Sequence, residues 1–165
     1  MLYLKTHQRA HSSETHRALE AADGYLYLGM AAEALQEFGG IPTEARLDAS
    51  VMLAEIRVML HLKHWKQAEK LSARGTQLHP DEDEFTVQRI FSLHHLEKAE
   101  EACRILHAAP EWIRRTGILH YNLACYEARL GDLKTARECI DVAIELNSAI
   151  KKKARTDPDL AALWN

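Results

Sequence analysis

The chain has 165 residues, of which 47% are hydrophobic, and a formal net charge of -3 at pH 7. This near-neutral balance argues against a dedicated nucleic-acid binder, and no apolar run of about 18 residues is present that would span a membrane. The short apolar start before Arg9 does not read as a signal peptide, and three cysteines without a CxxC pattern favour a reduced, cytoplasmic setting.

Helix-forming residues dominate from end to end. Ala, Leu, Glu, Lys and Arg fill most of the chain, whereas it holds only seven Gly and four Pro. Alternation of β-branched residues is scarce, so the composition predicts an all-α fold. Residues 1–14 are expected to form a tail and the start of a helix, with Ser12 or Ser13 as the helix cap.

Two columns of identical residues recur at a spacing of 34 positions. One column consists of Ala34, Ala68, Ala102 and Ala136. The other, six positions earlier, consists of Leu28, Leu62, Leu96 and Leu130. We expect each leucine to end a first helix and each alanine to lie inside a second helix that folds back on it. A small side chain at that place lets two antiparallel backbones approach closely.

The turn between the two helices is marked by glycine in the first and last repeats. Gly29 and Gly131 occupy equivalent positions, and glycine stops a helix because it accepts the left-handed conformation. Lys63 and Glu97 replace this glycine in the second and third repeats. We place the repeats, within one domain of residues 15–150, at 15–48, 49–82, 83–116 and 117–150.

The repeat motifs resemble those of the tetratricopeptide repeat (TPR) family. The fourth repeat reads YNLACYEARLGDLKTARECIDVAIEL, and the second contains HWKQAEKLSARGTQLHP. A helix-turn-helix period of 34 residues is characteristic of that family, and the resemblance runs from about His16 to Ile150. The first and third repeats are degenerate. The resemblance implies an α-α superhelix, a TPR-like solenoid of about four helical hairpins.

Residues 151–165 are expected to cap the last repeat, whose apolar face has no following neighbour. In the segment TDPDLAALW, Asp157 can cap a short helix with Pro158 in its first position. Three apolar residues then share one face: Leu160, Leu163 and Trp164. The combination of YNLACY with DPDLxxLW resembles a group of short bacterial TPR proteins, which implies a bacterial origin and no reaction. The basic run Lys151–Lys153 is interpreted as a solvated helix face.

A peptide-binding groove is expected on the first helices, because these line the concave side of stacked hairpins. The candidate contact residues are Tyr27, Leu53, Arg57, Phe91, His94, Tyr121, Asn122 and Arg129. Apolar side chains would supply affinity, and Asn122 would bond the ligand backbone. The alternative is that Phe91 and Tyr121 only pack between neighbouring first helices.

Some TPR proteins hold a partner's C-terminal carboxylate in a clamp of lysine, asparagine and arginine. Only Asn122 fits that clamp here, since Leu19, Asp23 and Leu53 stand where lysine or asparagine is needed. A clamp for chaperone tails is therefore not expected.

Ten histidines raise the question of a metal. His61 and His64 are three positions apart, and His61 and His95 are equivalent in consecutive repeats. Zinc normally takes three or four protein ligands, and no cysteine or carboxylate stands near these histidines at metal spacing. No metal or cofactor is therefore predicted, and Cys103, Cys125 and Cys139 are interpreted as small core or surface residues.

The predicted function is that of a non-enzymatic, cytoplasmic interaction module. It would bind a peptide segment of a partner protein in its concave groove, without nucleic acid or membrane. One alternative is a homodimer whose groove is filled by the tail MLYLKTHQRA, since Tyr3 and Leu4 are apolar residues in a polar segment. A third hypothesis is a metal-dependent enzyme that uses His61, His64 and His95.

Overall fold

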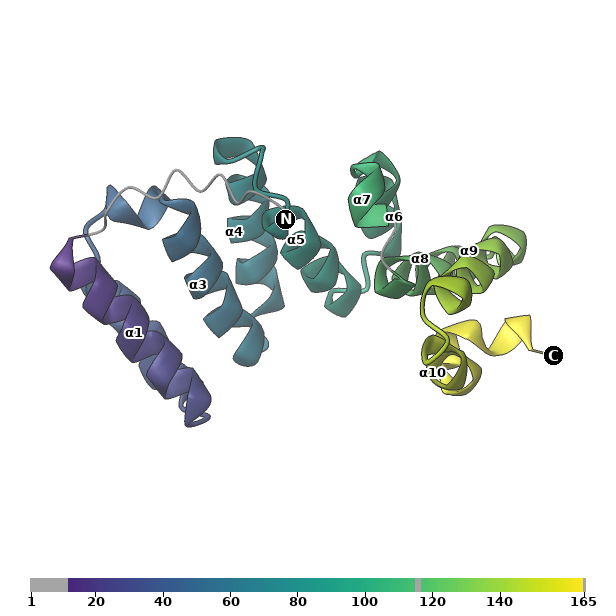
Figure 1. Cartoon of the computed structure of the whole chain (residues 1–165), viewed down its shortest axis with the longest axis horizontal. Coiled ribbons are helices and arrows are strands. Elements are labelled where there is room, and N and C mark those ends of the chain that lie inside the picture. Colours follow the sequence, from purple (N-terminus) through teal and green to yellow (C-terminus); the bar gives the residue numbers. More distant parts are fainter. Residues whose placement is uncertain (1–11, 115–116, 165) are drawn as a thin grey trace. The chain divides into compact units, whose positions relative to one another are not determined.

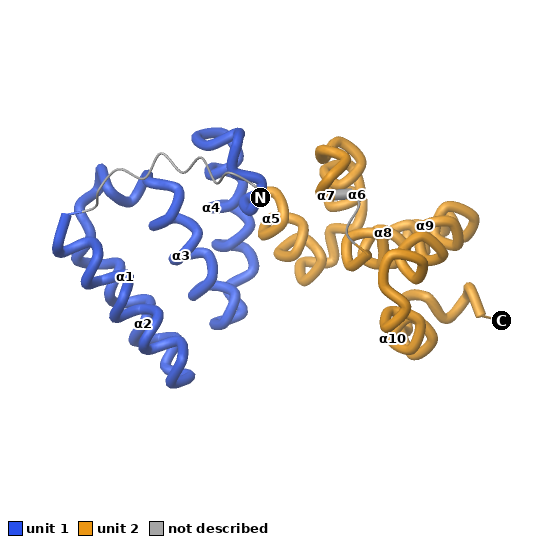
Figure 2. Tube along the Cα trace, in the orientation of Figure 1, with its two compact units in different colours: residues 1–85 blue, residues 86–165 orange. Residues whose placement is uncertain are grey.

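A computed structural model describes residues 12–114 and 117–164 of the chain. Within these ranges every regular element is helical and no strand occurs, so the all-α prediction is confirmed. The chain separates into two compact units, residues 1–85 and residues 86–165 (Figure 2). The single repeat domain over residues 15–150 stays a prediction.

The described part of unit 1 contains two helix pairs and two short 3-10 turns (Figure 1). In chain order they are α1 (Ser13–Tyr27), α2 (Ala31–Glu37), η1 (Phe38–Gly40), η2 (Ala45–Leu47), α3 (Ala49–His61) and α4 (Trp65–Leu78). Ser12 caps α1, since its hydroxyl accepts the Thr15 backbone N–H at 3.3 Å. This is one of the two predicted caps; residues 1–11 of the predicted tail lie outside the described residues.

Unit 2 begins within the helix that follows. Its described elements are α5 (Glu84–His95), α6 (Ala99–Ala108), α7 (Glu111–Arg114), α8 (Gly117–Leu130), α9 (Leu133–Leu146), α10 (Ile150–Thr156) and η3 (Pro158–Leu163). Helix α8 packs against α9 and α6, and it also contacts α10 and η3. Among the described residues, none of the helices combines the length and the apolar character needed to cross a membrane.

The turns inside the four described helix pairs share one hydrogen-bond pattern. A backbone N–H donates to the carbonyl five residues earlier, at 2.8–3.0 Å, from Met30 to Tyr25, His64 to Met59, Lys98 to Leu93 and Asp132 to Glu127. This is the long bond of the Schellman motif, which requires a left-handed residue just before the donor. That residue has φ of +73° at Gly29, +58° at Lys63, +59° at Glu97 and +89° at Gly131. The lysine and the glutamate thus adopt the conformation that glycine adopts in the other two turns.

The alanine column lies in the core of the helix pairs. Ala34, Ala68, Ala102 and Ala136 are all 0% exposed. Each belongs to a hydrophobic cluster made within its own unit. The positions predicted to need a small side chain are therefore all fully packed, which fits close approach of the paired helices.

A further pair of positions, which also recurs every 34 residues, lies at the junction from each second helix to the next first helix. Gly75 on α4 faces the ring of Phe85, and a Cβ placed on Gly75 would lie 2.2 Å from Phe85 Cδ1. The equivalent pairs are Ile41 with Val51, in one core cluster, and Ala109 with Leu119, in another. All six residues are buried. The largest side chain, Phe85, thus accompanies the residue that has none.

The C-terminal segment contacts α8 and α9, and within it Pro158–Leu163 forms the predicted short helix as a 3-10 helix. That residues 151–165 are a capping segment stays a prediction. Asp157 caps the 3-10 helix by accepting the Asp159 backbone N–H at 2.9 Å. Leu160 and Leu163 are buried, and the Trp164 indole N–H donates to the Ala154 carbonyl at 3.0 Å. The basic residues Lys151–Lys153 are exposed on α10, as predicted.

Candidate functional site

The candidate groove residues of unit 1 differ in exposure. Tyr27 is exposed at the end of α1, whereas Leu53 is half-buried against the cluster that contains Met52 and Ile56. Arg57 on α3 is exposed, and its guanidinium donates to the Asp23 carboxylate at 3.0 Å. Of these, the side chains of Tyr27 and Arg57 are open to a ligand.

On α5 of unit 2, the candidates are Phe91 and His94. Phe91 is 41% exposed, and its ring makes an edge contact with His95, with the ring centroids 4.7 Å apart. His94 is half-buried, with its ring 5.7 Å from that of Tyr126. Phe91 therefore presents apolar surface to solvent, while His94 belongs partly to the core.

Tyr121 on α8 is covered by the C-terminal segment. It is 3% exposed, its hydroxyl donates to the Asp157 carboxylate, and the Lys153 ammonium lies 4.5 Å from its ring centroid. Burial and this hydrogen bond raise the pKa of the Tyr121 phenol. A ligand would reach Tyr121 only if the segment moved, so the structure agrees better with a packing role. Asn122 is half-buried and Arg129 is exposed on the same helix.

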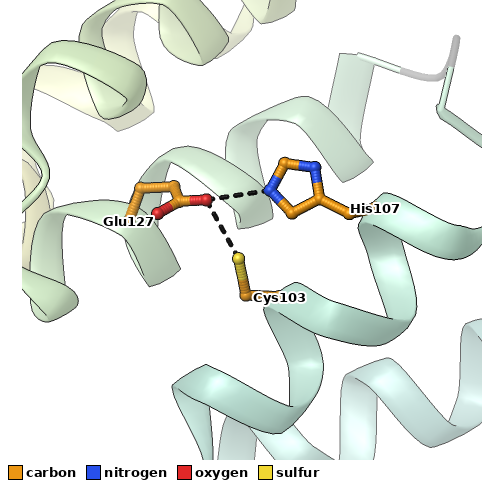
Figure 3. Close-up of side chains that lie close together, drawn as sticks. All are labelled: Cys103, His107 and Glu127. Carbon is orange, nitrogen blue, oxygen red and sulfur yellow. Dashed lines mark hydrogen bonds and ion pairs between the residues drawn. The ribbon is translucent and has the colours of Figure 1, made fainter.

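A different set of side chains converges between α6 and α8. Cys103 and His107 stand one helical turn apart on α6, and Glu127 reaches them from α8 (Figure 3). The Cys103 thiol donates to Glu127 Oε1 at 2.9 Å. His107 Nε2 lies 3.0 Å from the same oxygen. The three ligand atoms all fall within 4.8 Å of one another.

The electrostatics of this cluster are unusual because the carboxylate is buried. Glu127 is 8% exposed and Cys103 is 7% exposed, whereas the His107 side chain is 52% exposed. Among the described residues, Glu127 pairs with the basic side chain of His107. Burying an ionised carboxylate is costly unless it is paired and hydrogen-bonded. Glu127 therefore depends on two partners on α6.

Burial raises the pKa of the Cys103 thiol to about 12, assisted by its hydrogen bond to Glu127 and by the charge of that carboxylate. Burial, followed by the charge of Glu127, also raises the pKa of the nearby Cys139 thiol on α9, to about 11. Reactive cysteines need a lowered pKa and an electropositive setting. Cys103 is therefore a hydrogen-bond donor here and not an activated nucleophile.

A pocket of about 210 Å³ borders the cluster. Its lining residues come from α6 and α8 and are Leu106, His107, Leu119, His120 and Leu123. Its walls are mainly aliphatic, and two imidazoles supply the polar part. The exposed side of His107 thus faces open space large enough for a small group.

A second group of potential ligands, formed by Cys125, Asp157 and Asp159, has a structural explanation. One Asp157 oxygen accepts the Asp159 N–H and the other accepts the Tyr121 hydroxyl. Burial, followed by the charge of Asp157, raises the pKa of the Cys125 thiol to about 12. This group caps η3 and fastens it to α8.

The histidines that the sequence singled out do not form the cluster. His61 Nδ1 lies 2.9 Å from the Arg57 carbonyl, and neither His61 nor His64 belongs to a group of three potential ligands among the described residues. The predicted approach of His61 to His95 joins the two units and stays a prediction. The missed signal was the spacing of Cys103 and His107, which places both on one face of a helix. Glu127 is 20 positions further along, and only the packing of α8 on α6 brings it there.

Comparison with known proteins identifies the fold. No family model matches the sequence, and no curated protein matches it significantly. MamA from Desulfovibrio magneticus RS-1 superposes with a TM-score of 0.82 at 15% identity, covering 93% of this chain and 85% of the MamA chain. MamA from AMB-1 gives a TM-score of 0.74 at 14% identity, covering 93% of this chain and 88% of that one. These neighbours are TPR-like helical solenoids, so the predicted fold class is confirmed.

Proposed function

We propose that this chain is a non-enzymatic interaction scaffold that binds a peptide segment of a partner protein through the first helices of its repeats. The observation that carries the proposal is Phe91, which is 41% exposed although Ile90 and Leu93 beside it on α5 are buried. Large aromatic side chains are among the residues that dominate binding energy at protein interfaces. TPR-like hairpins, in turn, present first helices along an extended binding surface.

The exposed candidates define the chemistry of the ligand. Phe91 and Tyr27 offer apolar surface, and Arg57 and Arg129 offer exposed guanidinium groups. A peptide with an apolar anchor and acidic side chains would match both the apolar surface and the guanidinium groups. The half-buried Asn122 would hydrogen-bond to the peptide backbone. Leu53 and His94 would contribute at the edge of the contact. Tyr121 is not proposed as a direct contact, because its hydroxyl already bonds Asp157 and its ring already faces the Lys153 ammonium.

The non-enzymatic part of the proposal is supported by the state of the buried polar cluster. Its cysteine donates a hydrogen bond to Glu127, and its pKa is raised to about 12. A nucleophile for acyl or group transfer requires the opposite shift.

Single substitutions with matched controls test the proposal. Phe91→Ala and Arg57→Ala remove the proposed contacts, while Trp112→Ala and Arg74→Ala remove an exposed aromatic ring and an exposed guanidinium elsewhere. Partners captured from lysate by the immobilised chain are identified by mass spectrometry, and the dissociation constant of a purified partner is measured by titration. Loss of a central aromatic contact costs about 2 kcal/mol or more, which is a weakening of roughly 30-fold.

The controls should leave the dissociation constant nearly unchanged. If folded Phe91→Ala and Arg57→Ala proteins bind the partner as the unchanged chain does, the first helices are not the binding surface. Each unit is tested by its own substitution, so failure in one unit does not obscure the result in the other.

Self-association is a second candidate, favoured by the α1–α2 turn. Leu28 and Met30 are exposed there beside Tyr27, which places three apolar side chains at one tip. We expect light scattering to give twice the chain mass if this tip or the tail of residues 1–11 forms a dimer. Self-association would be excluded if the full chain, a Leu28→Glu variant and a chain without residues 1–11 each gave the mass of its own monomer.

A further inference from the structure

We propose that Cys103, His107 and Glu127 form a binding site for a divalent metal ion of the zinc class. A thiol, an imidazole and a carboxylate converge within 4.8 Å, two from α6 and one from α8. Zinc is bound in proteins by these three ligand types. The site lies within unit 2 and does not depend on the peptide contacts proposed above.

Charge is the first argument. Glu127 is buried, and its ion pair is to an exposed histidine. On binding, the Cys103 S–H bond breaks, the sulfur keeps the electron pair and bonds the metal, and the proton leaves to solvent. The thiolate and the carboxylate then carry two negative charges, which balance the two positive charges of the ion. A neutral His107 supplies a lone pair and adds no charge.

Geometry is the second argument. Zinc ligands lie about 2.0–2.3 Å from the ion, which places the ligand atoms of a tetrahedral site about 3.5 Å apart. In the structure the thiol and the imidazole are 2.9 Å and 3.0 Å from Glu127 Oε1. The sulfur and the nitrogen therefore each have to move away from Glu127 Oε1 by a few tenths of an ångström, and their own separation is within 4.8 Å. The exposed side chain of His107 has the freedom to do this, and its backbone and that of Cys103 stay in place on α6.

The surroundings leave a coordination position open. Three protein ligands with one open position are typical of zinc sites that take water or a further ligand. His107 lines the pocket of about 210 Å³, which provides space for that further ligand. The ion would tie α6 to α8, which belong to successive predicted repeats.

Cobalt is a suitable probe, because a thiolate bound to Co²⁺ gives a charge-transfer absorption that imidazole and carboxylate do not give. The full chain, made without a histidine tag and treated with a chelator, is titrated with Co²⁺ and then with Zn²⁺. We expect one ion per chain, the thiolate band with cobalt, its loss on displacement by zinc, and a rise of the melting temperature with either ion.

Matched variants locate the ligands. Cys103→Ser should abolish the thiolate band. It should weaken zinc binding by more than the roughly 10–100-fold that follows loss of a residue hydrogen-bonded to a ligand. Cys125→Ser removes a buried thiol on α8 and should keep the band and the zinc affinity. Since Cys103→Ser could perturb the core, the exposed His107→Ala provides a second measurement, with the exposed His64→Ala as its control. His107→Ala should weaken binding at least tenfold.

Three results would each overturn the assignment. The first is a chain that takes up no cobalt or zinc at stoichiometric concentration. The second is a thiolate band that persists in folded Cys103→Ser, and the third is an affinity unchanged in His107→Ala. Peptide binding measured with the Phe91 variants is a separate readout, so either proposal can fail without the other.

Discussion

The α3–α4 hairpin of unit 1 and the α8–α9 hairpin of unit 2 reach the same turn with different residues. The left-handed position is Lys63 in the first and Gly131 in the second, and the Schellman hydrogen bond is present in both. In each hairpin an alanine of the second helix is fully buried. The hairpin is therefore specified by packing and by main-chain hydrogen bonds, and glycine only lowers the conformational cost of the turn.

The two units also solve the next junction differently. Unit 1 packs the Phe85 ring against the bare backbone of Gly75, whereas unit 2 places Leu119 and Ala109 at the equivalent positions. A large side chain is combined with no side chain in one case, and a medium one with a methyl group in the other. In these two pairs a larger side chain accompanies a smaller one, whereas Ile41 and Val51, the third equivalent pair, are both branched, so each junction sets its own volume.

The largest effect is expected from Gly75→Ala. The new Cβ would lie 2.2–2.6 Å from Phe85 ring atoms, so the buried ring must move. Overpacking costs roughly 1–3 kcal/mol, and contacts this short to a buried ring correspond to the upper end of that range. Replacing a helical glycine offsets about 1 kcal/mol of this cost. We expect the free energy of unfolding, measured with denaturant, to fall by about 2 kcal/mol.

The comparison with unit 2 supplies the control. Phe85→Leu alone leaves a cavity and should cost about 1–2 kcal/mol. The double variant recreates the Ala109–Leu119 pair, so its loss should be smaller than the sum of the two single losses by at least about 1 kcal/mol. Additive losses would show that the two residues do not share one volume.

The sequence was sufficient to predict the hairpins because packing leaves a periodic record. The alanine and leucine columns located the second helices and the ends of the first ones, and Asp157 and Pro158 marked the C-terminal turn. These signals are local or recur every 34 residues. By contrast, the Gly75–Phe85 pair depends on which residue faces which: a glycine inside α4 is unusual in a helix, but its position alone does not identify the ring that packs against it.

The binding surface and the polar cluster were harder to predict, for a different reason. Tyr121 was placed on the concave face by its helix position, but residues 36 positions away cover it. Cys103 and Glu127 are 24 positions apart, and their contact requires the packing of α6 on α8. Contacts between helices of different repeats leave no mark in a helical wheel, which represents one helix at a time.

The next effect in size concerns the glycine turns. Gly131→Ala forces a side chain into the left-handed region, but nothing lies within 4 Å of the added Cβ. The cost is therefore conformational only, and the free energy of unfolding should fall by about 1 kcal/mol. Gly29→Ala, in the same open setting, serves as a repeat of the measurement in unit 1. A loss of much more than this would mean that the turn is packed against something.

The reciprocal change should stabilise the other hairpin. Lys63 has φ of +58°, so Lys63→Gly removes a conformational cost of about 1 kcal/mol from the folded state. Glycine also has more conformational freedom in the unfolded chain, and this offsets part of the gain. We expect a gain of about 0.5 kcal/mol in the free energy of unfolding. Glu97→Gly should behave alike, whereas Lys70→Gly, at an exposed position in the interior of α4, should destabilise by about 1 kcal/mol. A loss on Lys63→Gly would indicate that the lysine side chain itself holds the turn.

The smallest expected effect is a pH dependence of stability that arises from the helix cap of α9, which α4 lacks. Asp132 caps α9 by accepting the Thr135 backbone N–H at 3.0 Å and its hydroxyl at 2.7 Å, whereas His64 gives α4 no side-chain cap. These hydrogen bonds, the backbone one first, lower the pKa of the Asp132 carboxyl below its ordinary value of 3.8. A carboxyl whose pKa is lowered by folding stabilises the folded state above its ordinary pKa, and this contribution is lost as pH falls through the lowered value.

Asp132→Asn keeps a capping oxygen but cannot titrate. We therefore expect any excess of melting temperature of the unchanged chain over Asp132→Asn to be largest near neutral pH and to shrink as pH falls below about 4. A difference that does not change with pH would mean that the carboxylate charge does not contribute to this cap.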